Sequence, residues 1–259
     1  MGCALMKAAA VLVGAGAIGY SDEDKAKAIT AAASGGQVYD SNIEAVRKGE
    51  YVFLAIKPQV LKTVLKEIAP VLKEMFEAGK APILVSMAPG WTIAKLQEEL
   101  GFKTPVVRIM PNTPSLISKG LIVMCHSREV PPEKFMELEK ILGAAGMIER
   151  LEEKYFDAAT AISGSGPAYV CLFIEALADA GVRSGLSRDK ALFFASQTVF
   201  GSAAMVMETG KHPGELKDMV TSPAGVTIEG IAALENGAFR GTIINAVEAA
   251  LRRSIEMGN

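Results

Sequence analysis

The stretch YVFLAI at residues 51–56 is apolar at every position. A short run of this kind, with no polar alternation, is typical of a strand that is buried on both faces of a parallel sheet. A second such run, PILVSM at residues 82–87, follows an amphipathic helical pattern at residues 59–79, which we expect Pro70 to interrupt. Strand, helix and strand with short connections predict a mainly parallel sheet with helices on both faces.

The same alternation extends outward from these two strands to residues 1 and 150. Further strands are predicted at residues 17–20, 37–39, 106–110, 120–125 and 147–151, and further helices at residues 24–33, 42–48, 92–100 and 132–143. Ligands of such sheets bind beyond the carboxyl ends of the strands. We therefore expect the functional site at the residues that follow those ends, which are Ser21-Asp22, Lys57-Pro58, Ala88-Pro89-Gly90 and Pro111-Asn112.

The second half of the chain has no strand pattern, and we place the domain boundary between residues 1–152 and residues 153–259. Helices are predicted at residues 155–162, 167–185, 188–209, 213–220, 227–236 and 239–257. Residues 168–182 and 191–207 are apolar on nearly all sides, so such helices must be buried on nearly all sides. A region of this size cannot bury them alone, and we expect a homodimer through the helical domain, with higher oligomers of dimers open.

Composition excludes several other classes of protein. The 259 residues carry 27 basic and 29 acidic side chains, a net charge of −2 that attracts neither nucleic acid nor an anionic membrane. Cys3, Cys125 and Cys171 are far apart and form no CxxC motif, so we expect reduced thiols in a cytoplasmic protein. With only His126 and His212 present, we expect no metal site. No uninterrupted apolar run approaches the length of a membrane span.

A G-x-G-x-x-G match at residues 14–19 has two interpretations. It is either a dinucleotide phosphate loop after a strand at residues 10–13, or the turn into a later strand. The second interpretation explains more, because the residues from Met1 resemble the first helix of a Rossmann-like domain entered at its third glycine, Gly2. Asp22 then lies 20 residues later, where an acidic side chain accepts from ribose hydroxyls. On this interpretation we expect a strand and two glycines upstream of Met1.

Five further motifs, in one order along the chain, carry a resemblance to a known family. They are AIKPQ at residues 55–59, MPNTP at 110–114, SGSGPAY at 163–169, HPGELKD at 212–218 with TSPAGVTI at 221–228, and NAVEA at 245–249. The chain resembles pyrroline-5-carboxylate reductase along nearly its whole length. It departs from that family at Ala224, where glycine is frequent, and at Val226, where a small or hydroxylated residue is frequent.

The resemblance implies an α/β Rossmann-like domain followed by an all-α dimerisation domain, and reduction of a cyclic imine to L-proline with NADPH or NADH. It implies cofactor contacts from Met1, Gly2, Ser21, Asp22, Asn42, Ala55, Ile56, Lys57, Pro58, Met87, Ala88 and Pro89. It implies substrate contacts from Asn112, Ser163, Gly164, Ser165, Gly166, Pro167, Ala224, Gly225, Val226 and Thr227, with Thr227 as the catalytic residue. Because acidic residues and no arginine follow the strand at residues 17–20, we expect NADH to be favoured.

Each segment also has a plainer structural interpretation. Lys57 and the residues 87–89 can be ordinary strand stops, and Asn42 a helix cap. We expect residues 163–167 to form a break between helices, because two glycines and a proline disfavour a helix. Thr227 can be a helix cap as well as a substrate ligand. His212, beside a proline at a predicted helix start, is interpreted as a capping residue rather than a proton donor.

Two rival functions remain open at this stage. A β-hydroxyacid dehydrogenase would share both halves, but its catalytic lysine belongs in the zone that here spans residues 163–175, which contains none. A catalytically silent dinucleotide-binding regulator or scaffold would suit a chain that lacks the start of its phosphate loop, if Met1 is the true start. An assay with pyrroline-5-carboxylate and reduced nicotinamide nucleotide separates these possibilities.

Overall fold

In the computed structural model, which describes residues 1–258, the chain forms two compact units. The first comprises Met1–Ser165 together with the residues from Ala250 onward, and the second comprises the residues between them. The second unit is therefore inserted between two segments of the first. The division at residue 152 inferred from the sequence concerns function, and compactness assigns the first turns of the helical half to the first unit.

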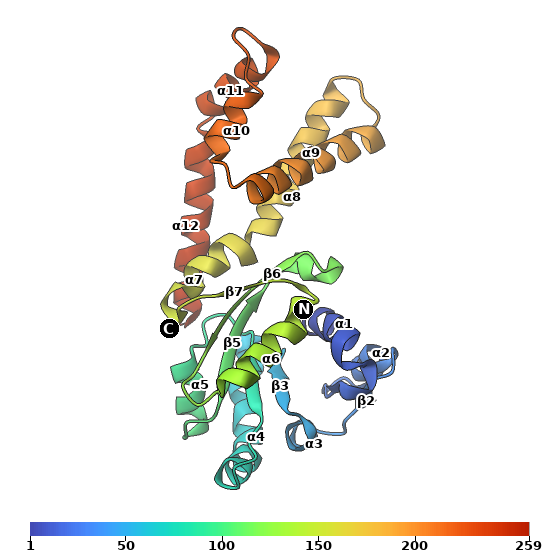
Figure 1. Cartoon of the computed structure of the whole chain (residues 1–259), viewed down its shortest axis with the longest axis vertical. Coiled ribbons are helices and arrows are strands. Elements are labelled where there is room, and N and C mark those ends of the chain that lie inside the picture. Colours follow the sequence, from blue (N-terminus) through green and yellow to red (C-terminus); the bar gives the residue numbers. More distant parts are fainter. Residues whose placement is uncertain (259) are drawn as a thin grey trace. The chain divides into compact units, whose positions relative to one another are not determined.

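A five-stranded sheet forms the centre of the first unit, with the order β3-β4-β5-β6-β7 (Figure 1). Its strands are β3 (Tyr51–Leu54), β4 (Ile83–Ser86), β5 (Val106–Pro111), β6 (Gly120–His126) and β7 (Gly146–Arg150). All neighbours are parallel except β5 and β6. The connection between these two strands is too short for a parallel crossover and contains only the 3-10 helix η2 (Thr113–Ile117). The mainly parallel sheet expected from the sequence is confirmed.

Helices cover both faces of this sheet, as the fully apolar strands require (Figure 1). The helices α1 (Gly2–Val13) and α6 (Pro132–Gly143) pack on one face, and α3 (Asn42–Lys48), α4 (Pro58–Glu77) and α5 (Ile93–Leu100) on the other. Consecutive residues of β4 alternate between the two cores, Ile83 and Val85 on one side and Leu84 on the other. Leu84 and Val85 are fully buried.

The expected interruption of α4 at Pro70 is wrong, because the helix runs through it. Pro70 lies on the exposed side of α4, where the carbonyl that loses its hydrogen bond is open to solvent. Thr92 caps α5, since its Oγ1 accepts from the amide of Lys95 at 3.1 Å.

A separate two-stranded parallel sheet joins β1 (Gly19–Tyr20) to β2 (Gln37–Val38), with α2 (Lys25–Ala32) between them in sequence. The helix α1 extends to Val13, so the alternative strand at residues 10–13 is wrong. The 3-10 turn η1 (Ala15–Ala17) follows and leads into β1. The glycine-rich match is therefore the turn into a strand rather than a phosphate loop.

The expected break at residues 163–167 is also wrong. The chain passes from η3 (Glu153–Tyr155) and α7 (Phe156–Ala159) into a π-helical turn, η4 (Thr160–Gly164), and then into α8 (Gly166–Arg183). The amide of Ser165 donates to the carbonyl of Thr160 at 3.0 Å, five residues earlier. A π turn inserts one residue without ending the helix, which is how the glycines are accommodated, and such turns are frequent at functional sites.

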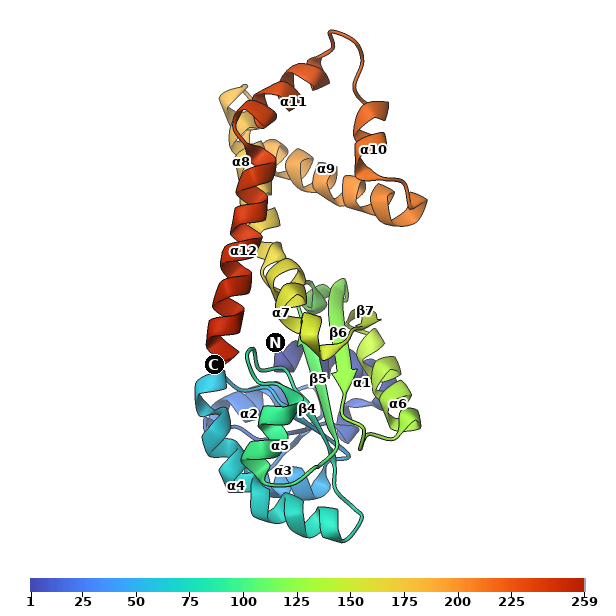
Figure 2. The same cartoon turned by 90° about the vertical axis from the view of Figure 1, so that its left-hand side faces the viewer.

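The second unit is entirely helical. It contains α8, α9 (Arg188–Thr209), α10 (Pro213–Met219), α11 (Val226–Asn236) and the first part of α12 (Phe239–Gly258) (Figure 2). The core between α8 and α9 is small and consists of Ala178, Ala191 and Ala195 with Ile174 and Val182 beside them. Many larger apolar side chains of this unit are exposed, among them Leu172, Phe193, Phe194, Phe200, Met207 and Val220.

Two helical stretches, Glu153–Arg183 and Arg188–Thr209, are long and apolar enough to span a bilayer by length and mean hydropathy. Only 11% of the most apolar window of each is buried within the chain. Both stretches therefore present apolar surface that this chain does not itself cover.

Candidate active site

A cavity of about 1030 Å³ lies in the first unit. Residues at the ends of β1, β2 and β3 and residues of α1, α2 and α3 line it. This volume is at the upper end of the range for small-molecule and cofactor sites. Seven of the twelve residues expected to contact a cofactor line it: Met1, Gly2, Ser21, Asp22, Asn42, Ala55 and Ile56. The residues come from segments up to 55 positions apart, so the fold rather than the local sequence brings them together.

Close approach of backbones shapes this cavity at Gly2. A Cβ atom at Gly2 would lie 2.6 Å from the Cβ of Ala55, which follows β3. Helix α1 therefore approaches the strand end at a distance that only glycine permits. In dinucleotide-binding folds a glycine with this role lets the helix pack tightly on the sheet beside the phosphates.

A chain of hydrogen bonds fixes the polar rim of the cavity. Ser21 Oγ donates to Asn42 Oδ1 at 3.0 Å, and Asn42 Nδ2 donates to Glu67 Oε2 at 2.9 Å. A carboxylate can only accept, so Glu67 determines which way the Asn42 amide points. The capping interpretation of Asn42 is wrong, because Ser41 caps α3 and accepts from the amide of Glu44 at 3.2 Å.

Charges beside this rim are largely paired. Asp22 Oδ1 accepts from the amide of Asp24 at 2.9 Å, and Asp24 caps α2. Lys25 and Lys27 pair with Asp40 at 2.7 Å and with Asp24 at 3.3 Å. The Lys25 ammonium holds the pKa of the Asp40 carboxyl below its usual value.

The remaining expected cofactor residues lie at the same sheet edge but outside the lining of this cavity. Lys57 flanks the start of α4 and Pro58 is its first residue, while residues 87–89 follow β4. The strands β3 and β4 are parallel neighbours, with Leu54 opposite Ser86, so both segments leave the sheet side by side. Ala88 is buried, and its amide donates to Ser86 Oγ at 3.4 Å.

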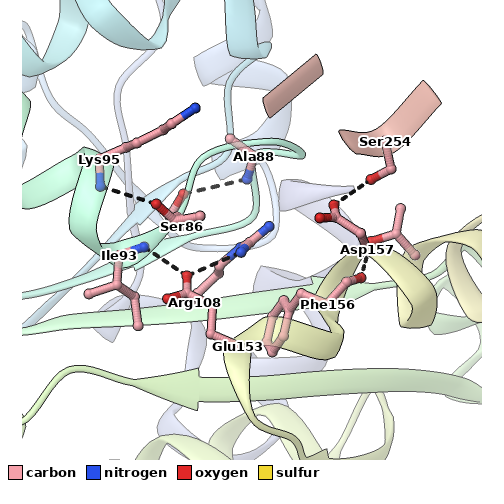
Figure 3. Close-up of polar contacts among 11 residues, drawn as sticks. Ser86, Ala88, Ile93, Lys95, Arg108, Glu153, Phe156, Asp157 and Ser254 are labelled. Atoms are coloured by element: carbon pink, nitrogen blue, oxygen red, sulfur yellow. Dashed lines mark hydrogen bonds and ion pairs between the residues drawn. The ribbon is translucent and has the colours of Figure 1, made fainter. Parts of the chain in front are cut away.

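An ion pair joins a buried arginine of β5 to a partly exposed glutamate that follows β7 (Figure 3). Arg108 on β5 is only 3% exposed, and its Nη1 is 3.1 Å from Glu153 Oε1. The same oxygen accepts from the amide of Ile93, at the start of α5, at 2.7 Å. The guanidinium also lies over the ring of Phe156, with 4.8 Å from its central carbon to the ring centre. Burial raises the pKa of the nearby Cys125 thiol to about 12, so this thiol is neutral at physiological pH.

The π turn is anchored to the end of β5. Asn112 Nδ2 donates to the carbonyl of Ser163 at 3.0 Å, and Asn112 Oδ1 accepts from the amide of Leu121 at 2.9 Å. Ser163 Oγ donates to the carbonyl of Ala159 at 2.8 Å. The side-chain polar groups of Asn112 thus hold Ser163, while Gly164 and Ser165 complete the turn and Gly166 and Pro167 begin α8.

In the second unit, residues 224–227 form the start of α11. Gly225 is the residue before the helix, Val226 is its first residue and 93% exposed, and Thr227 is exposed. Thr227 is thus inside the helix, and its interpretation as a cap is wrong. Ala224 adopts φ +54°, a left-handed conformation that is uncommon outside glycine. No side chain caps this helix within the described residues, so its first amides are free to bind an anion.

His212 has the capping role expected for it. Its Nδ1 accepts from the amide of Gly214 at 3.1 Å, at the start of α10. With Nδ1 as the acceptor, the neutral ring carries its proton on Nε2.

Sequence reasoning missed the four aromatic residues of the cavity, which are Tyr20, Tyr39, Tyr51 and Phe53. Tyr20 is the last residue of β1, and Tyr39 directly follows β2, the parallel neighbour of β1. Burial raises the pKa of Tyr20 above its usual value. Pairing of the two predicted strands at residues 17–20 and 37–39 was the signal that would have found Tyr20 and Tyr39.

The fold and the cavity define the class: a chain with a Rossmann-like α/β domain, which has a cavity of the size of a cofactor site, and a helical second domain. The family model for pyrroline-5-carboxylate reductase dimerisation matches residues 153–257. The family model for NADP oxidoreductase, coenzyme F420-dependent, matches residues 1–90.

Relatives of known name agree with both matches. The pyrroline-5-carboxylate reductase of Glycine max is 50% identical over 220 residues, which is 85% of this chain and 78% of the relative. That of Escherichia coli K12 is 40% identical over 83% of this chain and 78% of its own length. The crystal structure of Plasmodium falciparum pyrroline carboxylate reductase with NADP bound has a TM-score of 0.88 at 36% identity, over 100% of this chain and 95% of that chain. The chain belongs to the pyrroline-5-carboxylate reductase family.

Proposed function

We propose that this chain reduces 1-pyrroline-5-carboxylate to L-proline with NADPH or NADH as the hydride donor. The observation that carries the proposal is the cavity of about 1030 Å³ in the first unit, lined by seven residues that the family resemblance assigns to the cofactor. Gly2 supplies the close helix-to-strand approach that such a cofactor needs, and the rim formed by Ser21 and Asn42 offers hydrogen-bonding groups to a ribose. The residues present therefore fit a nicotinamide dinucleotide.

We infer that residues 55–58 and 87–89, which leave the sheet side by side, form the wall against which the nicotinamide ring lies. When bound, the reduced ring supplies a hydride to the imine carbon. The substrate is a cyclic imine that protonates readily, so the chain needs to orient it rather than to provide a strong acid. Catalysis then rests on positioning, with the reacting carbons about 3–3.5 Å apart.

For the substrate itself we propose two segments. The π turn and the start of α8, residues 163–167, form one wall, with Asn112 holding Ser163 in place. The backbone amides of residues 224–227 bind the substrate carboxylate, and the Thr227 hydroxyl forms a hydrogen bond with the ring nitrogen. Of these amides, that of Gly225 donates to the carbonyl of Ser222 at 3.1 Å in the structure. Thr227 is exposed and not used as a cap, which leaves its hydroxyl available.

We propose that the helical half, residues 153–259, forms a homodimer, while residues 1–152 bind the nucleotide. The exposed large apolar groups of α8 and α9 need a cover, and a second copy supplies one without lipid. Assembly of such dimers into larger oligomers and a cytoplasmic location belong to the same proposal. Sedimentation in detergent-free buffer tests it, since a stable monomer or a protein recovered only with detergent would contradict it.

The activity test is direct. Purified protein with 1-pyrroline-5-carboxylate should oxidise NADPH or NADH, followed at 340 nm, and should form L-proline in equal amount. A β-hydroxyacid dehydrogenase would instead need a hydroxy acid and oxidised nucleotide. A non-catalytic regulator would bind the nucleotide and leave both substrates unchanged.

A further inference from the structure

The loop between β4 and α5, residues 87–92, is held by contacts from distant parts of the chain. We propose that Glu153 and the C-terminal turn of α12, residues 254–258, are positioning elements that hold this loop in the geometry that hydride transfer requires. The inference rests on the proposed function, in which residues 87–89 lie against the nicotinamide. All of these residues belong to the first unit.

Glu153 fixes the far end of the loop. Its Oε1 accepts from the amide of Ile93 at 2.7 Å, where α5 begins, and lies 3.1 Å from Arg108 Nη1 (Figure 3). Arg108 is fixed in turn by burial within the sheet. The end of the loop is thereby tied to β5 through one carboxylate oxygen.

Gly90 fixes the middle of the loop by backbone contact. It has φ +76° and is buried, and a Cβ atom there would lie 2.6 Å from the carbonyl oxygen of Met257 and 2.8 Å from the amide nitrogen of Gly258. The last turn of α12 therefore rests directly on the backbone of the loop. Any side chain at this position would push the two segments apart.

Ser254 anchors that last turn in its place. Its Oγ donates to Asp157 Oδ1 at 2.7 Å, and Ser254 is only 6% exposed (Figure 3). Asp157 lies one helical turn after Glu153, so the two anchors of the loop come from neighbouring parts of one segment. The segments that lead into and out of the second unit thus both hold the loop.

The kinetic consequence follows from the steep dependence of hydride transfer on geometry. A misplacement of about 1 Å can lower a rate by about 100-fold. The cavity that binds the rest of the nucleotide is lined by α1, β1 and α3 and does not include the loop. A loosened loop should therefore lower kcat and leave the KM for the nucleotide nearly unchanged.

Gly90→Ala tests the inference, with Gly101→Ala as its matched control. Gly101 has φ +80°, so alanine meets the same backbone strain there, but no atom lies within 4 Å of the added Cβ. We expect kcat to fall about 10-fold or more in Gly90→Ala and to stay within about two-fold of wild type in Gly101→Ala. Equal kcat losses in the two variants would overturn the inference.

A second readout needs no turnover. Trp91 is the only tryptophan of the chain and lies in this loop, so its fluorescence reports loop order directly. Without nucleotide or substrate, acrylamide should quench Trp91 more strongly in Gly90→Ala than in wild type or Gly101→Ala. Unchanged quenching in Gly90→Ala would also overturn the inference.

Removal of residues 257–259 completes the test. The shortened chain should show a kcat loss similar to that of Gly90→Ala, and adding Gly90→Ala to it should lower kcat no further, because the clashing backbone is gone. Multiplicative losses would contradict the inference. If Gly90→Ala does not fold, Ser254→Ala replaces it, with an expected kcat loss of about three-fold that Ser254→Thr restores. An inactive wild type would instead refute the proposed function.

Discussion

The ion pair of Arg108 and Glu153 allows a prediction about stability whose size follows from burial. In Glu153→Ala, the Arg108 guanidinium stays 3% exposed and loses its carboxylate partner, while its Nε already lacks a hydrogen-bond partner. Breaking a buried pair on one side costs about 3–5 kcal/mol, and the 28% exposure of the Glu153 side chain favours the lower end. The Ile93 amide also loses its acceptor, which costs about 1 kcal/mol.

We therefore expect Glu153→Ala to lower the free energy of unfolding by about 3–4 kcal/mol, measured by urea denaturation followed by far-UV circular dichroism. Adding Arg108→Met should recover about 2 kcal/mol, since the unpaired charge is then gone. Asp40→Ala is the control: it breaks a pair of 2.7 Å whose side chains are 65% and 88% exposed, and should cost at most about 0.5 kcal/mol. Equal losses for Glu153→Ala and Asp40→Ala would refute the reasoning.

Four further predictions concern single positions. Thr227→Ala should lower kcat about 10–100-fold with a small change in KM, and Thr227→Ser should stay near wild type; steady-state kinetics decide, and an unchanged kcat in Thr227→Ala would reject the hydroxyl contact. Ala224→Gly should raise stability by about 1 kcal/mol in thermal unfolding, because it removes a left-handed alanine. Cys125 should resist iodoacetamide at pH 8 until the protein is unfolded, because burial raises the pKa of its thiol to about 12. A labelled Cys125 found by mass mapping of the native protein would contradict this prediction. Glu67→Gln frees the Asn42 amide to turn, and Ser21 can then donate to a 2′-phosphate. The ratio of kcat/KM for NADPH to kcat/KM for NADH should therefore rise. Glu74→Gln on the same helix loosens only an exposed pair with Arg47 and should leave this ratio unchanged.

The layered fold of the first half was predictable because its strands are apolar on both faces and its connections are short. Residues 51–56 and 82–87 contain β3 and β4, and the predicted helices between and after them formed. The predictions failed where the surroundings of a residue in the folded chain outweighed its local propensity. Pro70 remains inside α4 because it lies on the exposed side of the helix, where the unpaired carbonyl is open to solvent.

The site was predictable only as far as strand ends and family motifs reach. Ser21, Asp22 and Asn42 converge on one cavity, as the rule for parallel sheets requires. Glu67 and Glu153 carried no signal in the sequence, because each acts through a hydrogen bond to a residue 25 or 60 positions away. The π turn was missed since glycine and proline propensities describe the ending of α-helices and not the insertion of one residue.

The insertion of the second unit between two segments of the first has a consequence for synthesis on the ribosome. The segment that rests on Gly90 emerges more than 150 residues after the loop it contacts. Contacts of such sequence separation form late, because the entropy cost of closing a long loop comes before the contacts can stabilise the chain. The α/β layers can assemble while the chain is still growing, but the loop beside the proposed nicotinamide site acquires its final neighbour only after the helical unit has been made. The nascent chain would thus pass through a stage at which it is folded in its first half and not yet competent for hydride transfer.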